Sequence, residues 1–357
     1  MATSPTSSTS PGSPTSHLLE LEDLRMYFHT QDGVVKAVDG VSYTLDAGQT
    51  LGVVGESGSG KSVTAMSIMG LTPMPPGKIH GGDVRFKGES MLTMSNKQLR
   101  GLRGNHIAMI FQDPLSSLNP VQRVGKQVGE GLTLHKGYKK KQAFQRAIEL
   151  LDMVGIPNPD ERARDYPHQF SGGMRQRAMI AMALACDPEI LIADEPTTAL
   201  DVTIQAQILE LMQEMQRQHG TAIIMITHDL GVVADMADNI MVMYAGKPVE
   251  YGTTDQVFYS PLHPYTWGLM RSIPKRTLDD DQPLTPIAGN PPSLIDLPAG
   301  CAFSPRCPYA TERCNTEEPT IREIEQGHSS ACLFSGDAAF LKNSPIYDTA
   351  SEGDGDE

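Results

Sequence analysis

The sequence predicts an α/β fold in which helices cover both faces of a parallel sheet. Nearly continuous apolar strands are expected at residues 190–193 and 222–226, with a helix over residues 202–218 between them. A third apolar strand, residues 50–54, runs into a Gly-rich loop that a helix at residues 62–71 follows. Buried strands that alternate with helices are typical of a parallel sheet, so these segments are expected to form the core.

The composition is that of a globular chain without membrane spans. Hydrophobic residues make up 39% and charged residues 20% of the 357 positions, and no apolar run reaches the roughly eighteen residues that a spanning helix needs. The first sixteen residues are mostly Ser, Thr and Pro and lack the basic start and apolar stretch of a secretory signal. We therefore expect a cytoplasmic chain with a disordered leader at residues 1–17.

The net charge of −14 argues against a general nucleic-acid binder. Six of the acids lie within residues 336–357. Such an acidic segment is typical of a solvated, disordered tail.

Pattern changes divide the rest of the chain. Short strands are expected over residues 18–51. Helical periodicity replaces them from about 113 to 186, which predicts an inserted helical subdomain. The Pro-rich stretch 261–298 marks the change to a C-terminal region. The expected domains are a main domain at 18–260, which contains the insertion, and an extension at 261–335.

The most specific motif is a phosphate-binding loop. It reads Gly55-Glu56-Ser57-Gly58-Ser59-Gly60-Lys61-Ser62 and lies between a strand and a helix. The glycines let backbone N–H groups close around phosphate oxygens, the helix presents its positive end, and Lys61 reaches the terminal phosphates. Ser62 is expected to hold Mg²⁺ through its hydroxyl, so the loop predicts a nucleoside triphosphate site.

A pair of carboxylates follows the strand at residues 190–193. Asp194 and Glu195 end that strand, which would deliver them beside the bound phosphates. We expect Asp194 to bind Mg²⁺, directly or through water. Glu195 is then expected to polarise the water that attacks the γ-phosphoryl group. The metal neutralises one acid, which allows the two neighbours to take different roles.

The segment Phe170-Ser171-Gly172-Gly173-Met174-Arg175-Gln176-Arg177 resembles the signature of the ABC ATPases. A Ser hydroxyl, small glycines and a helix N-terminus make an anion site. The resemblance implies a P-loop NTPase core with an antiparallel β subdomain and the inserted helical subdomain. It also implies that Ser171, Gly172, Gly173 and Met174 cap ATP held on a partner subunit. Met174 departs from the Gln of many members, as it does in peptide-importer subunits.

Further matches to the ABC ATPases follow in the family's order. Gln112 resembles the residue that contacts Mg²⁺ and the attacking water, and His228 resembles the switch histidine near the γ-phosphate. Asp201, in Ala199-Leu200-Asp201, resembles the loop that crosses the dimer interface. Phe28 occupies the place of the adenine-stacking aromatic, although Tyr27 is adjacent and core packing is the alternative. The implied ATP-binding set is Gly55, Glu56, Ser57, Gly58, Ser59, Gly60, Lys61, Ser62, Val63 and Phe28.

The C-terminal region resembles the ATPase subunits of oligopeptide and dipeptide permeases. The resemblance rests on three segments: Pro261-Leu262-His263-Pro264-Tyr265-Thr266, Gly289-Asn290-Pro291-Pro292 and the run from Cys301 to Pro308. It implies the ATP-hydrolysing subunit of an importer of oligopeptides, with dipeptide, nickel and glutathione importers as alternatives. A soluble ABC ATPase acting on nucleic acid or the ribosome is the competing class, but those chains carry tandem cassettes or long coiled-coil insertions.

The same resemblance implies the partners and the location. The chain is expected to pair with a second, homologous ABC ATPase as a heterodimer. Two transmembrane permease subunits and an external peptide-binding protein would complete the complex, with no nucleic acid. The subunit would then lie peripherally on the cytoplasmic face of the cell membrane.

Four cysteines fall in a short region that is poor in secondary-structure pattern: Cys301, Cys307, Cys314 and Cys332. Four thiolates can staple such a region by binding Zn²⁺ or an iron–sulfur cluster. The spacing lacks the paired C-x-x-C of common zinc sites, and the resemblance implies a four-iron, four-sulfur cluster. Zinc, reduced thiols and disulfides remain the alternatives. Cys186 is expected to be buried packing.

Overall fold

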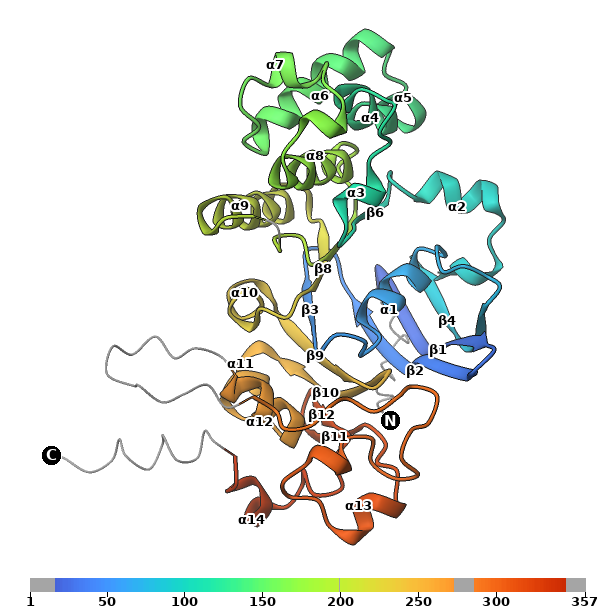
Figure 1. Cartoon of the computed structure of the whole chain (residues 1–357), viewed down its shortest axis with the longest axis vertical. Helices are drawn as coiled ribbons and strands as arrows, with labels where there is room; N and C mark the ends of the chain where they lie inside the picture. The colour runs from blue at the N-terminus through green and yellow to red at the C-terminus, as the bar shows by residue number, and fades with distance from the viewer. Residues whose placement is uncertain (1–16, 199, 273–285, 345–357) are drawn as a thin grey trace, which may run out of the picture.

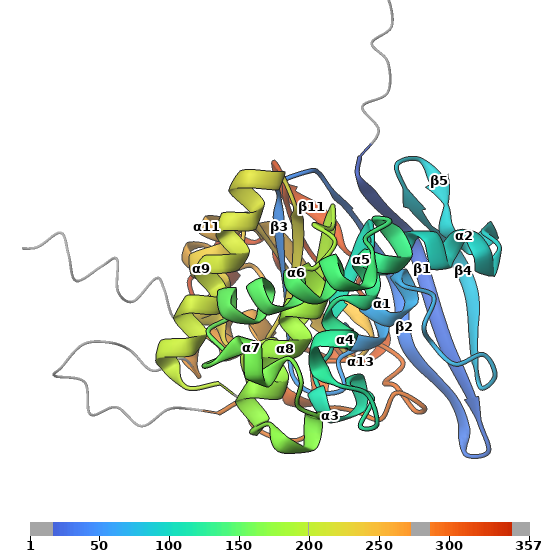
Figure 2. The same ribbon diagram turned by 90° about the horizontal axis from the view of Figure 1, so that it is seen from above.

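The computed structural model describes residues 17–198, 200–272 and 286–344. The predicted leader therefore lies outside the described residues except for residue 17, and the predicted tail is described only over 336–344. Two sheets form the frame of the molecule, with a helical layer at one end and the C-terminal extension at the other (Figure 1). In Figure 2, which is seen from above, the helical layer lies in front of the sheets.

The first sheet is antiparallel and has the order β2-β1-β4-β5. Its strands are β1 (Leu19–Thr30), β2 (Gly33–Leu45), β4 (Gly77–Phe86) and β5 (Glu89–Ser90). β1 and β2 are longer than the short strands expected here, and they join through a turn at Gln31 and Asp32. The pairing slips near Asp23, which has a φ of 46°. This irregularity breaks the period-two pattern, which is why the sequence suggested shorter strands.

The second sheet has eight strands in the order β11-β12-β10-β9-β3-β8-β7-β6. The pairs from β9 to β6 are parallel, whereas β10 pairs antiparallel with β9 and with β12. The three strands predicted from apolar runs are β3, β7 and β8, which confirms the α/β fold. The strands are β3 (Thr50–Val54), β6 (Ile107–Ile110), β7 (Ile190–Asp194), β8 (Ala222–Ile226), β9 (Asn239–Tyr244), β10 (Lys247–Thr253), β11 (Arg322–Glu325) and β12 (His328–Ser330).

The predicted helical insertion contains α3 (Pro114–Ser117), α4 (Val124–Val128), α5 (Glu130–His135), α6 (Lys140–Met153), α7 (Pro159–Arg162) and α8 (Gly172–Leu184). The other helices are α1 (Lys61–Ile68), α2 (Asn96–Leu102), α9 (Val202–His219), α10 (Leu230–Met236), α11 (Thr254–Tyr259), α12 (Pro264–Arg271), α13 (Glu312–Thr316) and α14 (Ala338–Leu341), with short 3₁₀ turns at Met91–Thr93, Pro167–Gln169 and Ser304–Arg306. None of the helices within the described residues is long and apolar enough to cross a membrane.

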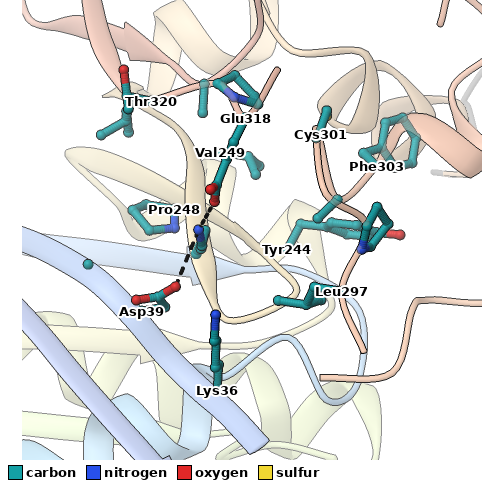
Figure 3. Close-up of a pocket in the computed structure, with 18 of the residues that line it drawn as sticks. Lys36, Asp39, Tyr244, Pro248, Val249, Leu297, Cys301, Phe303, Glu318 and Thr320 are labelled. Atoms are coloured by element: carbon teal, nitrogen blue, oxygen red, sulfur yellow. Dashed lines mark hydrogen bonds and ion pairs between the residues drawn. The ribbon is translucent and has the colours of Figure 1, made fainter. Parts of the chain in front are cut away.

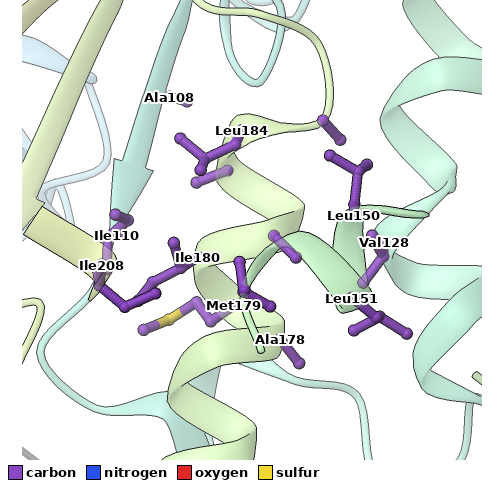
Figure 4. Packing of buried hydrophobic residues seen from close by; sticks show 14 of the residues in the cluster. Ala108, Ile110, Val128, Leu150, Leu151, Ala178, Met179, Ile180, Leu184 and Ile208 are labelled. Carbon is purple, nitrogen blue, oxygen red and sulfur yellow. The ribbon is translucent and has the colours of Figure 1, made fainter. Parts of the chain in front are cut away.

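Alternation along the parallel strands separates two apolar cores. Leu191 and Ala193 of β7 pack with α6, α8 and α9, whereas Ile190 and Ile192 pack against β1, β2 and α1. Figure 4 shows the side chains that α6, α8 and α9 contribute to the first of these cores. Successive strand residues face opposite sides, so one short strand contributes to both cores. Cys186 lies in the helical core with 1% of its surface exposed, as expected for apolar packing. The sheet that carries the site is therefore fixed from both faces.

The extension shares a third core with the main domain. Tyr244 and Val249 of the large sheet pack with Tyr265 of α12 and with Phe303. Strand β12 also joins the sheet by pairing with β10. The extension, coloured orange to red in Figure 1, is thus continuous with the sheet.

Candidate nucleotide site

The phosphate loop, residues 55–62, follows β3 and leads into α1. Gly55 and Gly60 have φ values of 149° and 105°. A Cβ at Gly55 would lie 2.2 Å from the carbonyl oxygen of Met243, and one at Gly60 would lie 2.3 Å from that of Ala37. These glycines are therefore required by close backbone approach as well as by conformation.

Lys61 is folded back over the loop. Its Nζ donates to the carbonyl oxygens of Gly55 at 2.6 Å and Glu56 at 2.9 Å. Burial lowers the pKa of Lys61, and the nearby carboxylates of Glu195 and Asp194 oppose that change. The ammonium group is thus held at the loop by acceptors that phosphate oxygens can replace.

Asp194 ends β7 and is 3% exposed. Burial raises the pKa of its carboxyl group, a hydrogen bond from Ser62 lowers it, and the charge of Glu195 raises it further. Its Oδ1 has no hydrogen-bond partner among the described residues. A buried, unpaired carboxylate oxygen beside a serine hydroxyl matches the oxygen ligands that Mg²⁺ prefers.

Glu195 follows Asp194 in the left-handed backbone region, with a φ of 48°. Its Oε2 accepts from Gln112 Nε2 at 3.3 Å and from Thr198 Oγ1 at 3.1 Å, and its Oε1 lies 3.4 Å from His228 Nδ1. Non-glycine residues rarely adopt this conformation, and such strain clusters at functional sites. The turn directs the carboxylate toward these three partners.

The order of the strands in the sheet explains why Gln112 and His228 lie beside Glu195. Gln112, Glu195 and His228 follow β6, β7 and β8, which are neighbouring parallel strands. The carboxyl ends of parallel strands share one edge of the sheet, where ligands of such folds bind. The structure therefore brings together the three residues that the sequence assigned to hydrolysis.

A cavity opens at this edge over the phosphate loop. Phe28 and Val63 line it together with Gln112 and Glu195, so the aromatic predicted to stack on adenine does lie beside the loop. Sequence reasoning missed three residues: Val35, Ala37 and, from the extension, Leu294. The full lining of the cavity is Phe28, Val35, Ala37, Ser57, Gly58, Gly60, Lys61, Ser62, Val63, Gln112, Glu195 and Leu294.

The signature segment, residues 170–177, does not contribute to the described lining of this cavity. Ser171 caps α8, and its Oγ accepts from the backbone N–H of Met174 at 3.3 Å. Ser171 and Gly172 are exposed, and no signature residue is among the described residues that line the cavity. The start of α8 is therefore open to an anion from outside this chain.

Asp201 caps α9, with Oδ1 accepting from the backbone N–H of Ile204 at 3.0 Å. Its predicted neighbour Ala199 lies outside the described residues. Within one chain Asp201 thus acts as an N-cap, and its place at a dimer interface stays a prediction.

The four cysteines of the extension, Cys301, Cys307, Cys314 and Cys332, line one small apolar cavity as free thiols. Burial raises the pKa of Cys307 to about 11 and that of Cys332 to about 12. Within the described ranges, no three His, Cys, Asp or Glu side chains are grouped as ligands of a metal ion. The iron–sulfur cluster and its zinc alternative therefore stay predictions.

A larger cavity separates the antiparallel sheet from the extension (Figure 3). Lys247 forms ion pairs there with Asp39 of β2 and Glu318 of the extension. Figure 3 also shows Lys36 and Leu297 at this cavity. None of the predicted nucleotide residues lines this larger cavity. The cavity over the phosphate loop, which several of them line, is therefore the candidate nucleotide site.

The fold and the site define the class as a P-loop nucleoside triphosphatase. The "ABC transporter" family model matches residues 38–198, and the "Oligopeptide/dipeptide transporter, C-terminal region" model matches residues 249–314. The oligopeptide transport ATP-binding protein of Bacillus subtilis is 54% identical over 87% of this chain and 87% of its own length. Its Salmonella typhimurium counterpart is 53% identical over 90% and 94%, respectively. The chain therefore belongs to the ABC transporter ATP-binding proteins of this oligopeptide and dipeptide transport family.

Solved structures agree on the fold of the main domain. An ATP-binding cassette, solved as a dimer in a post-hydrolysis state with ADP and phosphate, matches with a TM-score of 0.61 and 26% identity, over 66% of this chain and 98% of that one. CbiO1 of Clostridium perfringens, part of an ABC transporter complex, matches with a TM-score of 0.56 and 28% identity, over 69% and 92%.

Proposed function

We propose that this chain is the ATP-hydrolysing subunit of an ABC importer of oligopeptides. The carrying observation is that Gln112 and His228 both contact Glu195, which lines the cavity over the phosphate loop together with Gln112. Similarity to oligopeptide transport ATP-binding proteins extends through the C-terminal region and supports the cargo. Dipeptide, nickel and glutathione importers are the related alternatives.

The phosphate loop binds the triphosphate of ATP. Backbone N–H groups of residues 55–62 and the start of α1 surround the phosphates, and Lys61 exchanges its two carbonyl acceptors for phosphate oxygens. Phe28 stacks on the adenine. Ser62, Asp194 and Gln112 would hold Mg²⁺, which neutralises charge on the phosphates when bound.

Glu195 serves as the general base. Its carboxylate accepts a proton from the attacking water, while Gln112 and His228 orient that water and the γ-phosphoryl group from either side. Hydrogen bonding from Gln112 and Thr198 holds the carboxylate in place before ATP arrives. Little reorganisation is then needed during the reaction.

A second, homologous ATPase completes each site. Residues 171–174 at the start of α8, of which Ser171 and Gly172 are exposed, contact ATP on the partner, and Asp201 lies at the interface between the two subunits. Two transmembrane permease subunits and an external peptide-binding protein form the rest of the importer, with this chain on the cytoplasmic face of the membrane. Two observations support this arrangement: the open helix start and the position of the signature away from the chain's own cavity.

The four cysteines that line the small cavity of the extension bind a four-iron, four-sulfur cluster in this proposal, and zinc is the alternative. Their shared cavity supports a common ligand. Ligation requires thiolates. Loading of the site would thus release protons, because burial raises the pKa of Cys307 and Cys332.

The replacement Glu195→Gln tests the catalytic assignment. It keeps the shape of the side chain but removes the base, so we expect ATP hydrolysis by the purified complex to fall at least about 100-fold while ATP remains bound. Glu189→Gln is the matched control, because Glu189 precedes β7 and pairs with Lys87 at a distance from the cavity. Hydrolysis at an unchanged rate in Glu195→Gln would exclude Glu195 as the base.

Affinity purification of the chain from membranes tests the transporter assignment. We expect two permease subunits and a second ATPase to co-purify, with iron and sulfide present in the same sample. Recovery with ribosomes or DNA and without membrane partners would overturn the proposal. Zinc in place of iron and sulfide would correct the metal alone.

A further inference from the structure

An arginine of the extension holds the second residue of the phosphate loop. Arg306 ends the 3₁₀ turn Ser304–Arg306, and its side chain is 4% exposed. Nη1 donates to Glu56 Oε2 at 2.5 Å, and Nη2 donates to Glu56 Oε1 at 2.9 Å. The contact is therefore a bidentate ion pair between residues 250 positions apart in the sequence.

Further hydrogen bonds fix Arg306 itself. Its Nε donates to the carbonyl oxygen of Ala288 at 2.9 Å, and its Nη2 donates to that of Ile287 at 3.3 Å. Nη1 also donates to the hydroxyl of Tyr244 at 3.3 Å, and the guanidinium lies 5.8 Å from the centre of that ring. The fork is thus preorganised toward Glu56.

The backbone of Glu56 has its own contact with the extension. Its N–H donates to the hydroxyl oxygen of Tyr265 in α12 at 2.8 Å. Tyr265 is fully buried between Tyr244 and Phe303. The extension therefore restrains both the main chain and the side chain at this point of the loop.

The ion pair between Arg306 and Glu56 affects the electrostatic potential at the phosphate loop. Glu56 lies within a loop that is proposed to surround a triphosphate, and a carboxylate without a counter-ion there would repel the ligand. Its side chain is 28% exposed, so solvent screens that repulsion only in part. The guanidinium of Arg306 neutralises the carboxylate, and Glu56 is not among the described residues that line the cavity over the loop.

We propose that Arg306 is a positioning residue for ATP binding, and that the extension is a working part of the nucleotide site. Arg306 neutralises Glu56, and together with Tyr265 it fixes the entry to the phosphate loop. This inference rests on the proposed role of residues 55–62 in binding ATP.

Titration of the full-length chain with Mg·ATP in a calorimeter at fixed salt tests the proposal. We expect Arg306→Gln to weaken ATP binding about tenfold, because the uncompensated charge of Glu56 then repels the triphosphate. Adding Glu56→Gln to that variant removes the uncompensated charge, so affinity should return to within about threefold of the original chain. Arg313→Gln is the matched control, because Arg313 forms an exposed ion pair with Glu317 in the same extension.

Rescue by the second substitution separates positioning from a purely structural role. If Arg306→Gln binds ATP as tightly as the original chain, or if the double variant binds no better than the single one, the proposal is wrong. Arg306→Lys retains the charge without the fork and is expected to bind about threefold more weakly; it replaces Arg306→Gln if that variant fails to fold. A full-length original chain that binds no ATP would refute the nucleotide site itself.

Discussion

Glu195 has an unfavourable backbone conformation that places its carboxylate in the candidate site. Its φ of 48° lies in a region that L-residues with long side chains avoid. Three neighbours, Gln112, Thr198 and His228, then contact the carboxylate from separate segments. The position is strained but well supported, as is typical of functional sites.

Two glycines of the phosphate loop offer a matched test of steric need. Gly60 and Gly58 both have positive φ, at 105° and 79°. A Cβ at Gly60 would meet the carbonyl oxygen of Ala37 at 2.3 Å, whereas one at Gly58 would meet nothing within 4 Å. We expect Gly58→Ala to cost about 1 kcal/mol of unfolding free energy, and Gly60→Ala at least about 2 kcal/mol more.

Urea unfolding of the two variants gives these free energies directly. Equal losses for Gly58→Ala and Gly60→Ala would mean that conformation alone, and not the contact with Ala37, requires the glycine.

Among the elements, those with regular apolar patterns were predictable. Helix α9 was predicted over 202–218 and spans Val202–His219, because Asp201 caps its start and Gly220 ends it with a φ of 67°. Helix α1 ends at Ile68, short of the predicted residue 71, because Gly70 leaves the helical region with a φ of 59°. Local rules explain both outcomes.

The site was predictable where motifs carry it and not where packing does. Gln112, Glu195 and His228 follow neighbouring strands, so strand order alone brings them together. Arg306 and Leu294 reach the loop region from the far end of the chain, and no local pattern indicates such a contact. The one available signal was Glu56, an acid in a phosphate loop that needed a counter-ion.

The start of α12 predicts a dependence of stability on pH. His263 caps this helix by accepting the backbone N–H of Tyr265 at 3.0 Å, and burial lowers the pKa of its ring to about 3. Below the unfolded pKa of about 6.5, the unfolded chain takes up a proton that the folded chain does not. Stability from this group is therefore full above pH 6.5 and declines as the pH falls toward 3.

We expect this group to contribute a slope of up to about 1.4 kcal/mol per pH unit to the unfolding free energy. His263→Asn keeps an acceptor for the helix cap but does not titrate, so its urea unfolding series from pH 6.5 to 4 should be flatter than that of the original chain. Parallel curves would show that His263 takes up a proton without unfolding.

At the scale of the whole molecule, one buried carboxylate joins the extension to the main domain. Glu250 of β10 is fully buried and accepts from the backbone N–H groups of Leu262 and His263, from Thr266 Oγ1 at 2.6 Å, and contacts His328 Nε2 at 2.9 Å. All four partners lie beyond residue 260. The segments before and after residue 260 therefore share one buried hydrogen-bond network.

Removing the Glu250 carboxylate is expected to lower the stability of both the main domain and the extension. Glu250→Ala leaves several buried donors without an acceptor, which should lower the unfolding free energy by about 3 kcal/mol or more. Glu323→Ala, on exposed β11, is the control and should stay within about 0.5 kcal/mol. A small loss for Glu250→Ala in urea unfolding would indicate that water satisfies those donors.

The hairpin of β11 and β12 forms one edge of the large sheet. Without it, β10 would offer its unpaired N–H and C=O groups to any extended chain nearby. Strand β11 instead forms the outermost edge, and it presents Arg322, Glu323 and Glu325 within its four residues. Charged side chains on a short edge strand discourage pairing between molecules. The extension thus protects the sheet against intermolecular aggregation.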